Sequence, residues 1–534
     1  MNLETLKGMS RDEIEWVYNG LDCCVTREVY DAQMAAMDEV AARTAAFSHT
    51  LAAPVFEMSL RGTLIDRGKL EKNLKEFKTK HQKIAKNLTR LVEEGIGLAP
   101  FNYRSSPQLK NLFYSVLGLK PVKARNAAGV YAPTVNREAL EKLQRYWSAG
   151  PLCRHLISLR ELDKKISFLE TELDPDGCMR TSYNIAGTNT GRLSSSASDY
   201  GTGTNNQNIE RALREMFIAR KGMKLCNIDL EQADARNVGA ICWNNFVESH
   251  GESFAGAYLD ACESGDLHTQ VCRMAWRDLK WGEDPALYRA VADGIAYREM
   301  SYRDLAKRLG HGTNYFGTPR TMALHTKVET SIIDIFQTRY FGAFPVIGGA
   351  VGTSARYHGD NWHSWVSAQL SEYGYIITPH FNRRRYFFGR PEDDTTLREA
   401  IAYAPQSMTA DQIDTGIIRL WQKLQGKVFL LIQVHDSILF EYPEDEEEWI
   451  VPAALELLKI IIPLKRGREF YVPCEAKVGW NWADQDPKKL TKHGLPENYY
   501  GLAKWKGSGE DKRRRPPMPR SGPQTFSNML EVVL

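Results

Sequence analysis

Residues 427–441, KVFLLIQVHDSILFE, constrain the fold of this chain more than any other segment. Val428 to Val434 form a nearly unbroken apolar run, Ile438 to Phe440 form a second one, and a polar tripeptide separates them. Two apolar runs around a tight polar turn predict a buried β-hairpin. A buried aspartate is costly unless a cation or a hydrogen-bond donor meets it. Asp436 therefore either belongs to an ordinary polar turn or has a partner elsewhere in the chain.

The composition predicts a soluble protein of several lobes, because 534 residues exceed what one hydrophobic core supports. Lys and Arg number 69 against 66 Asp and Glu, so the net charge of +3 does not by itself predict a polyanionic partner. None of the nine cysteines forms a Cys-x-x-Cys pair, so neither a zinc site nor a disulfide framework is indicated. We find no cleavable signal and no apolar run of membrane-spanning length.

Asp229 is the first candidate partner for Asp436. It closes the predicted strand KLCNID, and LEQADAR follows it. A carboxylate at the end of a buried strand, opposite another on a hairpin tip, suits a two-metal site for phosphoryl transfer, where oxygen ligands must hold two Mg²⁺ ions close together. Two unrelated, partly buried acids are the alternative interpretation of this pair.

A second pattern lies in residues 303–317, RDLAKRLGHGTNYFG. Arg303, Lys307, His311 and Tyr315 follow one another at intervals of four, which places them on one face of a helix. Two cations, an imidazole and an aromatic ring suit a nucleoside triphosphate. Gly310 and Gly312 each weaken such a helix by about 1 kcal/mol relative to alanine, which we interpret as a sign of movement or close approach to a ligand. An amphipathic surface helix is the alternative.

Taken together, these segments resemble a family A DNA polymerase, the family of bacterial DNA polymerase I and many phage replicases. Asp229–Arg236 resembles the family's motif A, Arg303–Tyr315 its motif B, and Gln433–Ser437 its motif C. Further matches follow in the family's order from about residue 47 to about residue 485. They are Thr190-Gly-Arg-Leu-Ser-Ser195, Gln207-Asn-Ile209, Gly265-Asp-Leu-His268, Arg383-Arg-Arg385, Ala404-Pro-Gln406, Thr409-Ala-Asp411, Val472-Pro473 and Gly479-Trp480.

The resemblance implies a role for each residue of these motifs. Asp229 and Asp436 would be catalytic and would bind two Mg²⁺ ions, which Mn²⁺ could replace, with the Leu230 carbonyl as a third ligand. The residues implied to bind the deoxynucleoside triphosphate are Arg303, Lys307, His268, His311, Tyr315, Gln232 and Asp234. Among them Lys307 would also be catalytic, Tyr315 would stack near the nascent base pair, and Asp234 would form the gate against a 2′-hydroxyl.

The same resemblance implies contacts with primer–template DNA. Arg192 and Gln406 would read the minor-groove side of the primer end, and His435 would contact the primer strand. Asn208, Gln433 and Arg384 complete the implied DNA-binding set. A helix with apolar residues from Leu70 to Leu91 carries seven basic residues on its other face, which would hold phosphates and make binding salt-dependent; an ordinary solvated face is the alternative.

The fold implied is a mixed α/β right-hand polymerase fold with an antiparallel-sheet palm, helical fingers and a helical thumb. The expected domains are an exonuclease remnant at 1–46, the palm at 47–67, 166–245 and 396–505, the thumb at 68–165, the fingers at 246–395, and a basic disordered tail at 506–534.

Three residues depart from the family pattern. Ser437 stands where the bacterial enzymes carry an accessory glutamate, so we expect catalysis to survive. Asp234 replaces a glutamate and is one methylene shorter, which puts the strictness of sugar selection in doubt. His311 replaces a phenylalanine or tyrosine. A single-subunit, phage-type RNA polymerase and a non-catalytic DNA-binding replication subunit are the alternative functions.

At the N-terminal end, Tyr18-Asn-Gly-Leu-Asp22 resembles the third motif of the family's 3′–5′ exonuclease domain. The earlier carboxylate motifs are not found before it, so we expect no proofreading by this chain alone; a chance Tyr–Asp spacing is the alternative. A separate exonuclease or a processivity protein is a possible partner, which the tail could help to dock. We expect a cytoplasmic monomer with a role in DNA replication, in the host cytoplasm if a phage encodes it.

Overall fold

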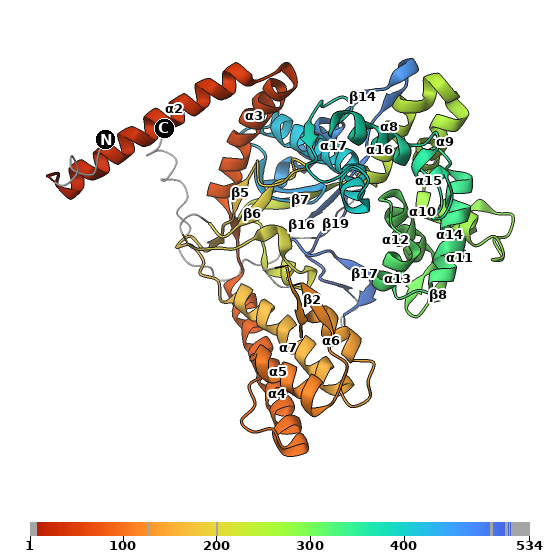
Figure 1. Ribbon diagram of the computed structural model, residues 1–534. Coiled ribbons are helices and arrows are strands. Elements are labelled where there is room, and N and C mark those ends of the chain that lie inside the picture. Colours follow the sequence, from red (N-terminus) through yellow and green to blue (C-terminus); the bar gives the residue numbers. More distant parts are fainter. Residues whose placement is uncertain are drawn as a thin grey trace.

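A five-stranded antiparallel sheet lies at the centre of the protein (Figure 1). The computed structural model describes residues 8–125, 129–198, 201–491, 495–507, 511 and 513. The strand order is β12–β13–β7–β16–β19. The strands are β12 (Phe429–Val434), β13 (Ser437–Pro443), β7 (Met223–Leu230), β16 (Cys474–Gly479) and β19 (Ala503–Lys504).

The predicted hairpin is confirmed. Only His435 and Asp436 separate β12 from β13, and Val434 pairs with Ser437 across the turn. On its other side β13 pairs with β7, which brings Ser437 opposite Asp229. The sequence alternation of β7 is visible in its burial, because Cys226, Ile228 and Leu230 all pack into the largest core cluster. Asp229 therefore points to the other face of the sheet.

Helices cover the face of the sheet to which Ile228 points. They are α8 (Ala233–His250), α17 (Asp394–Lys423) and α18 (Glu447–Leu458), which pack on one another and on strands β13 and β16. On the opposite face, Leu225 and Leu439 join a second cluster with Phe217 and Trp482. The sheet is thus closed on one face and only partly covered on the other, which leaves room beside Asp229.

A helical lobe with its own hydrophobic core extends below the sheet in Figure 1. Its long helix α4 (Arg67–Ile96) packs along α7 (Gly150–Leu169). The smaller elements are α5 (Ser106–Lys110), a π-helical turn (Asn111–Val116), β2 (Lys123–Arg125), β3 (Tyr131–Pro133) and α6 (Arg137–Leu143). Asp66 caps α4 by accepting a hydrogen bond from the Lys69 main-chain N–H at 3.1 Å. The seven basic residues predicted on α4 (Lys72, Lys75, Lys78, Lys80, Lys83, Lys86 and Arg90) are all exposed.

A second helical lobe follows α8 and lies to the right of the sheet in Figure 1. Its helices are α9 (Glu252–Glu263), α10 (Leu267–Ala275), α11 (Tyr288–Ala292), α12 (Tyr302–Asn314), α13 (Pro319–Thr326), α14 (Thr330–Ala343), α15 (Ala355–His358) and α16 (Trp362–Tyr373). Short strand pairs complete it: β8 (Ile295–Tyr297) with β9 (Met300–Ser301), and β10 (Tyr375–Ile377) with β11 (Arg384–Tyr386). Helix α12 packs against α10 and α14.

The remaining small strands pair antiparallel: β1 (Thr63–Leu64) with β4 (Cys178–Met179), β5 (Ser182–Asn184) with β6 (Ser194–Ser196), β14 (Ile462–Pro463) with β15 (Glu469–Phe470), and β17 (Asp486–Leu490) with β18 (Pro496–Glu497). None of the described helices is both long enough and apolar enough to cross a membrane.

The two ends of the described chain behave differently. Helix α3 (Glu39–Arg61) packs against β12 and α17, whereas α2 (Arg11–Ala36) buries none of its residues and projects away from the sheet (Figure 1). Within residues 506–534, where the sequence predicts a disordered tail, Arg513 is nevertheless held against the sheet. Its guanidinium donates to the main-chain oxygens of Tyr499, Gly501 and Val478 at 2.7–2.9 Å. Residues 508–510, 512 and 514–534 of this predicted tail lie outside the described residues.

The close packing of α8 on α9 predicts that replacing a glycine by alanine destabilises the protein at this contact but not at an exposed position of another helix. A Cβ added at Gly239 would lie 2.8 Å from the Leu259 Cα, so Gly239→Ala should lower the free energy of unfolding by about 1–3 kcal/mol. Gly342 of α14 has no atom within 4 Å of such a Cβ, and there the same substitution should be neutral or stabilising by up to about 1 kcal/mol. Thermal unfolding of both variants measures the contrast. Equal Tm changes would show that helix propensity alone decides at position 239.

Candidate active site

Asp229 and Asp436 lie at the same end of neighbouring strands. Asp229 pairs with Ser437 in the register of β7 and β13, and the Leu230 main-chain N–H donates to the Asp436 carbonyl oxygen at 3.0 Å. His435, before Asp436, has a φ of 56°, which turns the chain sharply at the hairpin tip. The structure therefore brings together the two carboxylates that are far apart in the sequence.

The two carboxylates oppose each other electrostatically. The protein around Asp229 and, next in importance, the charge of Asp436 raise the pKa of Asp229 to about 7, although its side chain stays open to solvent on one side. Burial also raises the pKa of Asp436, against a hydrogen bond from its own main-chain N–H. Within the described residues, neither carboxylate forms an ion pair with a Lys or Arg side chain. A pair of this kind gains stability from a bound cation.

The donor set fits magnesium. Mg²⁺ typically takes one or two carboxylates and completes its shell with water and substrate phosphates, not with a full cage of side chains. The described residues contain no group of three or more His, Cys, Asp or Glu side chains that could enclose a metal. Leu230 ends β7 directly after Asp229, so its main-chain carbonyl lies at the same end of the sheet.

Helix α12 carries the predicted cationic row on the face opposite its buried residues Leu305 and Leu309. Arg303 donates from Nε and Nη2 to the two carboxylate oxygens of Asp266 at 2.8 and 2.9 Å. Asp266 precedes α10, whose His268 is close enough for Arg303 and Lys307 to act on it. Burial and then these two cations lower the pKa of His268 to about 4, so it is neutral at pH 7. The structure thus brings Arg303, Lys307 and His268 together.

The two glycines of α12 serve packing within the lobe. A Cβ at Gly312 would meet the Met322 side chain at 3.0 Å, and one at Gly310 would lie 3.5 Å from the Tyr340 ring. Gly310 is itself buried against α14. Neighbouring side chains thus lie beside both glycines, Met322 at Gly312 and Tyr340 of α14 at Gly310. The interpretation of the two glycines as a sign of movement or close approach to a ligand stays a prediction.

The end of α12 meets the start of α8. The rings of His311 and Tyr315 make an edge contact, with centroids 4.6 Å apart. The Tyr315 hydroxyl donates to Asp234 Oδ2 at 3.0 Å, and Arg192 Nη2 donates to Asp234 Oδ1 at 3.4 Å. Burial lowers the pKa of His311, while the nearby charge of Asp234 raises it. The four predicted site residues are thus linked in a chain of contacts: His311 to Tyr315, Tyr315 to Asp234, and Asp234 to Arg192.

Asp234 also links this contact to the aspartate pair. The charge of Asp234 raises the pKa of Asp436, and that of Arg192 lowers it. Gln232 lies between Asp229 and Asp234 in the left-handed conformation, with φ of 56°, and its buried Oε1 accepts no hydrogen bond within the described chain. Because β7 ends at Leu230 and α8 begins at Ala233, Asp234 follows Asp229 closely in the chain, and its contact with Tyr315 brings the α12 row to the same end of the sheet as the two carboxylates.

The predicted DNA-binding residues have varied surroundings. Gln433 is buried, where its Nε2 donates to the His435 carbonyl at 2.6 Å and its Oε1 accepts from Gln207 at 2.9 Å. Asn208 and His435 are exposed, and Gln406 is half-buried on α17. Arg384 pairs with Asp38 at 2.7 Å and lies over the Tyr375 and Tyr386 rings. The charge of Arg384 thus already has an acidic partner.

One contact of the site was not predicted from the sequence. Thr409 Oγ1 donates to Asp234 Oδ1 at 2.8 Å, from the middle of α17. Thr409 belongs to a segment that matches the family, but no local pattern signals its role, because Asp234 lies far away in the chain.

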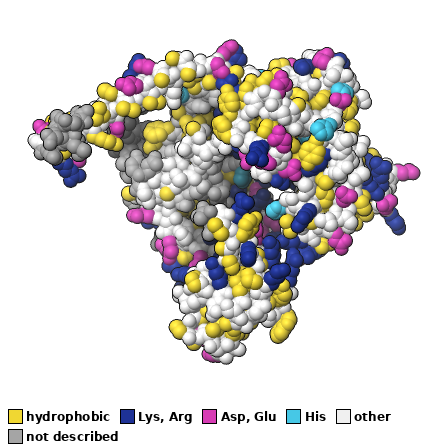
Figure 2. Space-filling view, in the orientation of Figure 1, with side chains coloured by type: hydrophobic (Ala, Val, Ile, Leu, Met, Phe, Trp, Pro, Cys, Tyr) yellow, Lys and Arg dark blue, Asp and Glu magenta, His cyan; other side chains and the backbone are white. Residues whose placement is uncertain are grey.

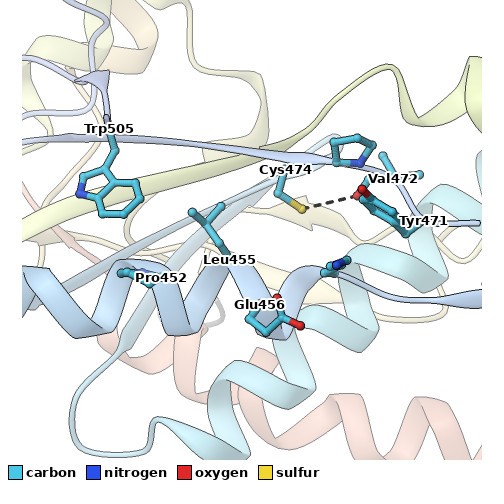
Figure 3. Close-up of a pocket in the computed structure, with 9 residues that line it drawn as sticks. Pro452, Leu455, Glu456, Tyr471, Val472, Cys474 and Trp505 are labelled. Atoms are coloured by element: carbon cyan, nitrogen blue, oxygen red, sulfur yellow. Dashed lines mark hydrogen bonds between the residues drawn. The ribbon is translucent and has the colours of Figure 1, made fainter. Parts of the chain in front are cut away.

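Figure 2 shows Lys and Arg side chains gathered around the hollow between the α4–α7 lobe and the lobe that contains α12. A different hollow of about 410 Å³ lies between α18 and β16 (Figure 3). It is lined mainly by apolar and aromatic side chains, including Leu455, Tyr471 and Trp505. Among the described residues, the charged side chains that line it are Glu456 and Lys459.

Comparisons with known proteins agree with this geometry. The model of the family "DNA polymerase family A" matches residues 68–484. DNA polymerase I of Thermus filiformis is 28% identical over 426 residues, 76% of this chain and 44% of its own length. DNA polymerase I of Chloroflexus aurantiacus is 26% identical over 456 residues, 81% of this chain and 42% of its own length. The chain thus spans less than half the length of these curated relatives.

The fold resembles that of a solved polymerase domain. It matches the POL domain of Pol1 from M. smegmatis, solved in complex with DNA primer-template and dNTP, with a TM-score of 0.62 at 23% identity. The match covers 81% of this chain and 70% of that one. The predicted fold class, a right-hand polymerase fold with an antiparallel sheet and helical lobes, is confirmed. The chain belongs to DNA polymerase family A.

The repulsion between Asp229 and Asp436 predicts a pH-dependent effect on stability. Because the pKa of Asp229 is raised, its contribution is most favourable below its ordinary pKa near 3.8 and is lost as pH rises through about 7. In metal-free buffer at pH 8, Asp229→Asn should therefore raise Tm, by about 1–2 °C after allowance for solvent screening. At pH 4 the difference should vanish. A variant no more stable than the parent at pH 8 would contradict the repulsion. Asp31→Asn, which removes an exposed acid paired with Arg27 on α2, serves as control.

Proposed function

We propose that this protein is a template-directed DNA polymerase in DNA replication. The hydroxyl at the primer's 3′ end attacks the α-phosphate of a paired deoxynucleoside triphosphate, and pyrophosphate leaves. One observation carries the proposal. Asp234, at the start of α8, lies near the Asp229–Asp436 pair at the end of β7, and it accepts a hydrogen bond from Tyr315 of the α12 row. Membership in DNA polymerase family A supports the proposal.

The predicted site residues have different roles, which follow from their charge. Asp229, Asp436 and the Leu230 carbonyl would hold two Mg²⁺ ions, or Mn²⁺ in their place, which neutralise phosphate charge and activate the attacking hydroxyl. Arg303 and Lys307 bind the triphosphate, and Lys307 stabilises the leaving pyrophosphate. His268 is neutral at pH 7, so it donates a hydrogen bond to phosphate without adding charge. Tyr315, Gln232 and Asp234 face the base and sugar.

The proposed DNA contacts come from the family resemblance. Six residues line the proposed path of the primer–template: Arg192, Asn208, Gln406, Gln433, His435 and Arg384. For Arg384 and Gln433 this role requires their present partners, Asp38 and Gln207, to be exchanged for DNA. The lysines of α4 bind backbone phosphates, as expected of an exposed basic helix face.

Primer extension by Asp229→Ala and Asp436→Ala tests the function and the metal assignment together. With Mg²⁺ and deoxynucleotides, the parent should extend a primer and each variant should lose at least about 1000-fold in kcat, by analogy with the loss of a group that stabilises the transition state. Asp31→Ala, which removes an exposed acid paired with Arg27 on α2, is the control.

Three outcomes would contradict this proposal. Extension by both alanine variants at the parent's rate would refute the metal assignment. Extension by the parent with ribonucleotides in place of deoxynucleotides would favour a single-subunit RNA polymerase, and binding of primer–template without any extension would favour a non-catalytic subunit.

His311 is proposed to relax discrimination against dideoxynucleotides. Burial lowers its pKa, so the ring is neutral and one ring N–H can donate where a tyrosine hydroxyl would. His311→Phe should therefore reduce the ratio of dideoxy- to deoxynucleotide incorporation by roughly five- to tenfold, the worth of one hydrogen bond. The same ratio for parent and variant would reject the idea, and His325→Phe on the neighbouring helix α13 controls for loss of an imidazole elsewhere.

The interpretation of residues 18–22 as an exonuclease motif also remains a proposal. Tyr18 and Asp22 lie one turn apart on α2, where both are exposed. Exposed apolar side chains accompany them on this helix, which suits contact with a further domain or a separate exonuclease chain. A processivity protein, a monomeric state, a phage source and residence in the host cytoplasm complete the proposals drawn from the family resemblance.

A further inference from the structure

The Asp234 carboxylate accepts hydrogen bonds from three separate parts of the chain. Asp234 is the second residue of α8, and its side chain is about one-fifth exposed. Tyr315, directly after α12, donates to Oδ2, while Thr409 of α17 and Arg192 donate to Oδ1. The shortest of these three contacts is that of Thr409, at 2.8 Å.

The surroundings of Thr409 direct its single hydroxyl proton. Thr409 is buried, and its oxygen lies near two acceptors, Asp234 Oδ1 at 2.8 Å and the Pro405 carbonyl at 3.0 Å. Asn237 Nδ2 donates to the same oxygen at 3.0 Å and also faces the Pro405 carbonyl and Gln412 Oε1. Because Asn237 occupies one lone pair and the carboxylate is the charged and nearer acceptor, the proton goes to Asp234.

This donor matters because the other contact to Oδ1 is weaker. Arg192 lies at 3.4 Å and is one-third exposed, so solvent competes for both partners. Without a buried donor on Oδ1, the carboxylate can rotate toward Arg192 and leave the Tyr315 hydroxyl. With Thr409 in place, one oxygen is fixed to α17 and the other remains available to Tyr315.

We propose that Thr409 is a positioning residue for Asp234 and thereby sets how strictly the site selects deoxyribose over ribose. The inference rests on the proposed polymerase function, in which Asp234 forms the gate against a 2′-hydroxyl. Thr409 does not itself touch the nucleotide. It fixes the rotamer of a side chain that is short for this role, so that the Asp234–Tyr315 contact closes the space beside the sugar.

Single-nucleotide primer extension tests the proposal through a ratio. The measured quantity is kcat/KM for a deoxynucleotide divided by kcat/KM for the matching ribonucleotide. Thr409→Val keeps the shape but removes the donor, and it should lower this ratio roughly tenfold, the scale of a hydrogen bond to a charged group. Thr409→Ser restores the hydroxyl and should restore the parent's ratio.

Thr415→Val is the matched control. Thr415 lies on the same helix and donates to the carbonyl four residues earlier, Asp411, at 2.6 Å, without a contact to Asp234. It should keep the parent's ratio, so a general weakening of α17 cannot imitate the expected result. Thermal unfolding of every variant confirms that each one is folded.

A second measurement detects the Tyr315–Asp234 contact directly and does not depend on polymerase activity. Fluorotyrosine placed at position 315 should give a ¹⁹F resonance that moves in Thr409→Val toward its position in Asp234→Asn, and that stays in place in Thr409→Ser and Thr415→Val. If either the sugar ratio or this resonance keeps its parent value in Thr409→Val, the proposal is overturned. If the parent extends no primer, the proposed function fails, and the ¹⁹F resonance alone then decides whether Thr409 positions Asp234.

Discussion

The register of β7 between β13 and β16 is the constraint on which the rest of the site depends. It pairs Asp229 with Ser437 on one side and with Glu475 on the other. Because side chains alternate along a strand, a slip of one residue would turn Asp229 into the face covered by α8 and α17. The buried alternation of Ile228 and Leu230 resists such a slip, so the hydrophobic core also fixes the position of the two carboxylates.

Two arginines of the proposed site already form ion pairs with acidic side chains. Arg303 is held by both oxygens of Asp266, and Arg192 by Asp234, so their guanidinium groups are oriented in advance. Such pairing lowers the entropy lost on binding, at the cost of competition between the acid and an incoming phosphate. The aspartate pair is the opposite case, since like charges are kept together and a cation relieves their repulsion.

The sequence predicted the parts of the site that local patterns encode. The hairpin follows from its two apolar runs, and the interval of four places Arg303, Lys307 and His311 on one face of α12. The pairing of β7 with β13 needed the family resemblance, because no local rule selects one distant strand over another. Thr409 and the Asp38 partner of Arg384 are side-chain contacts across distant elements, which sequence spacing does not show. The neighbours of the α12 glycines, Met322 and Tyr340, likewise come from other helices and could not be predicted from local spacing.

The left-handed turn at His435 has a consequence for comparing this protein with its relatives. At a φ of 56°, Asn, Asp, His and Gly are tolerated, whereas β-branched residues are strained. The choice of residue before Asp436 is therefore restricted by the backbone before any contact with nucleic acid is considered. A histidine found there in many sequences would record the geometry of the hairpin tip as much as a use of the imidazole ring. Asparagine at this position keeps the turn without the ring, and so separates the two causes.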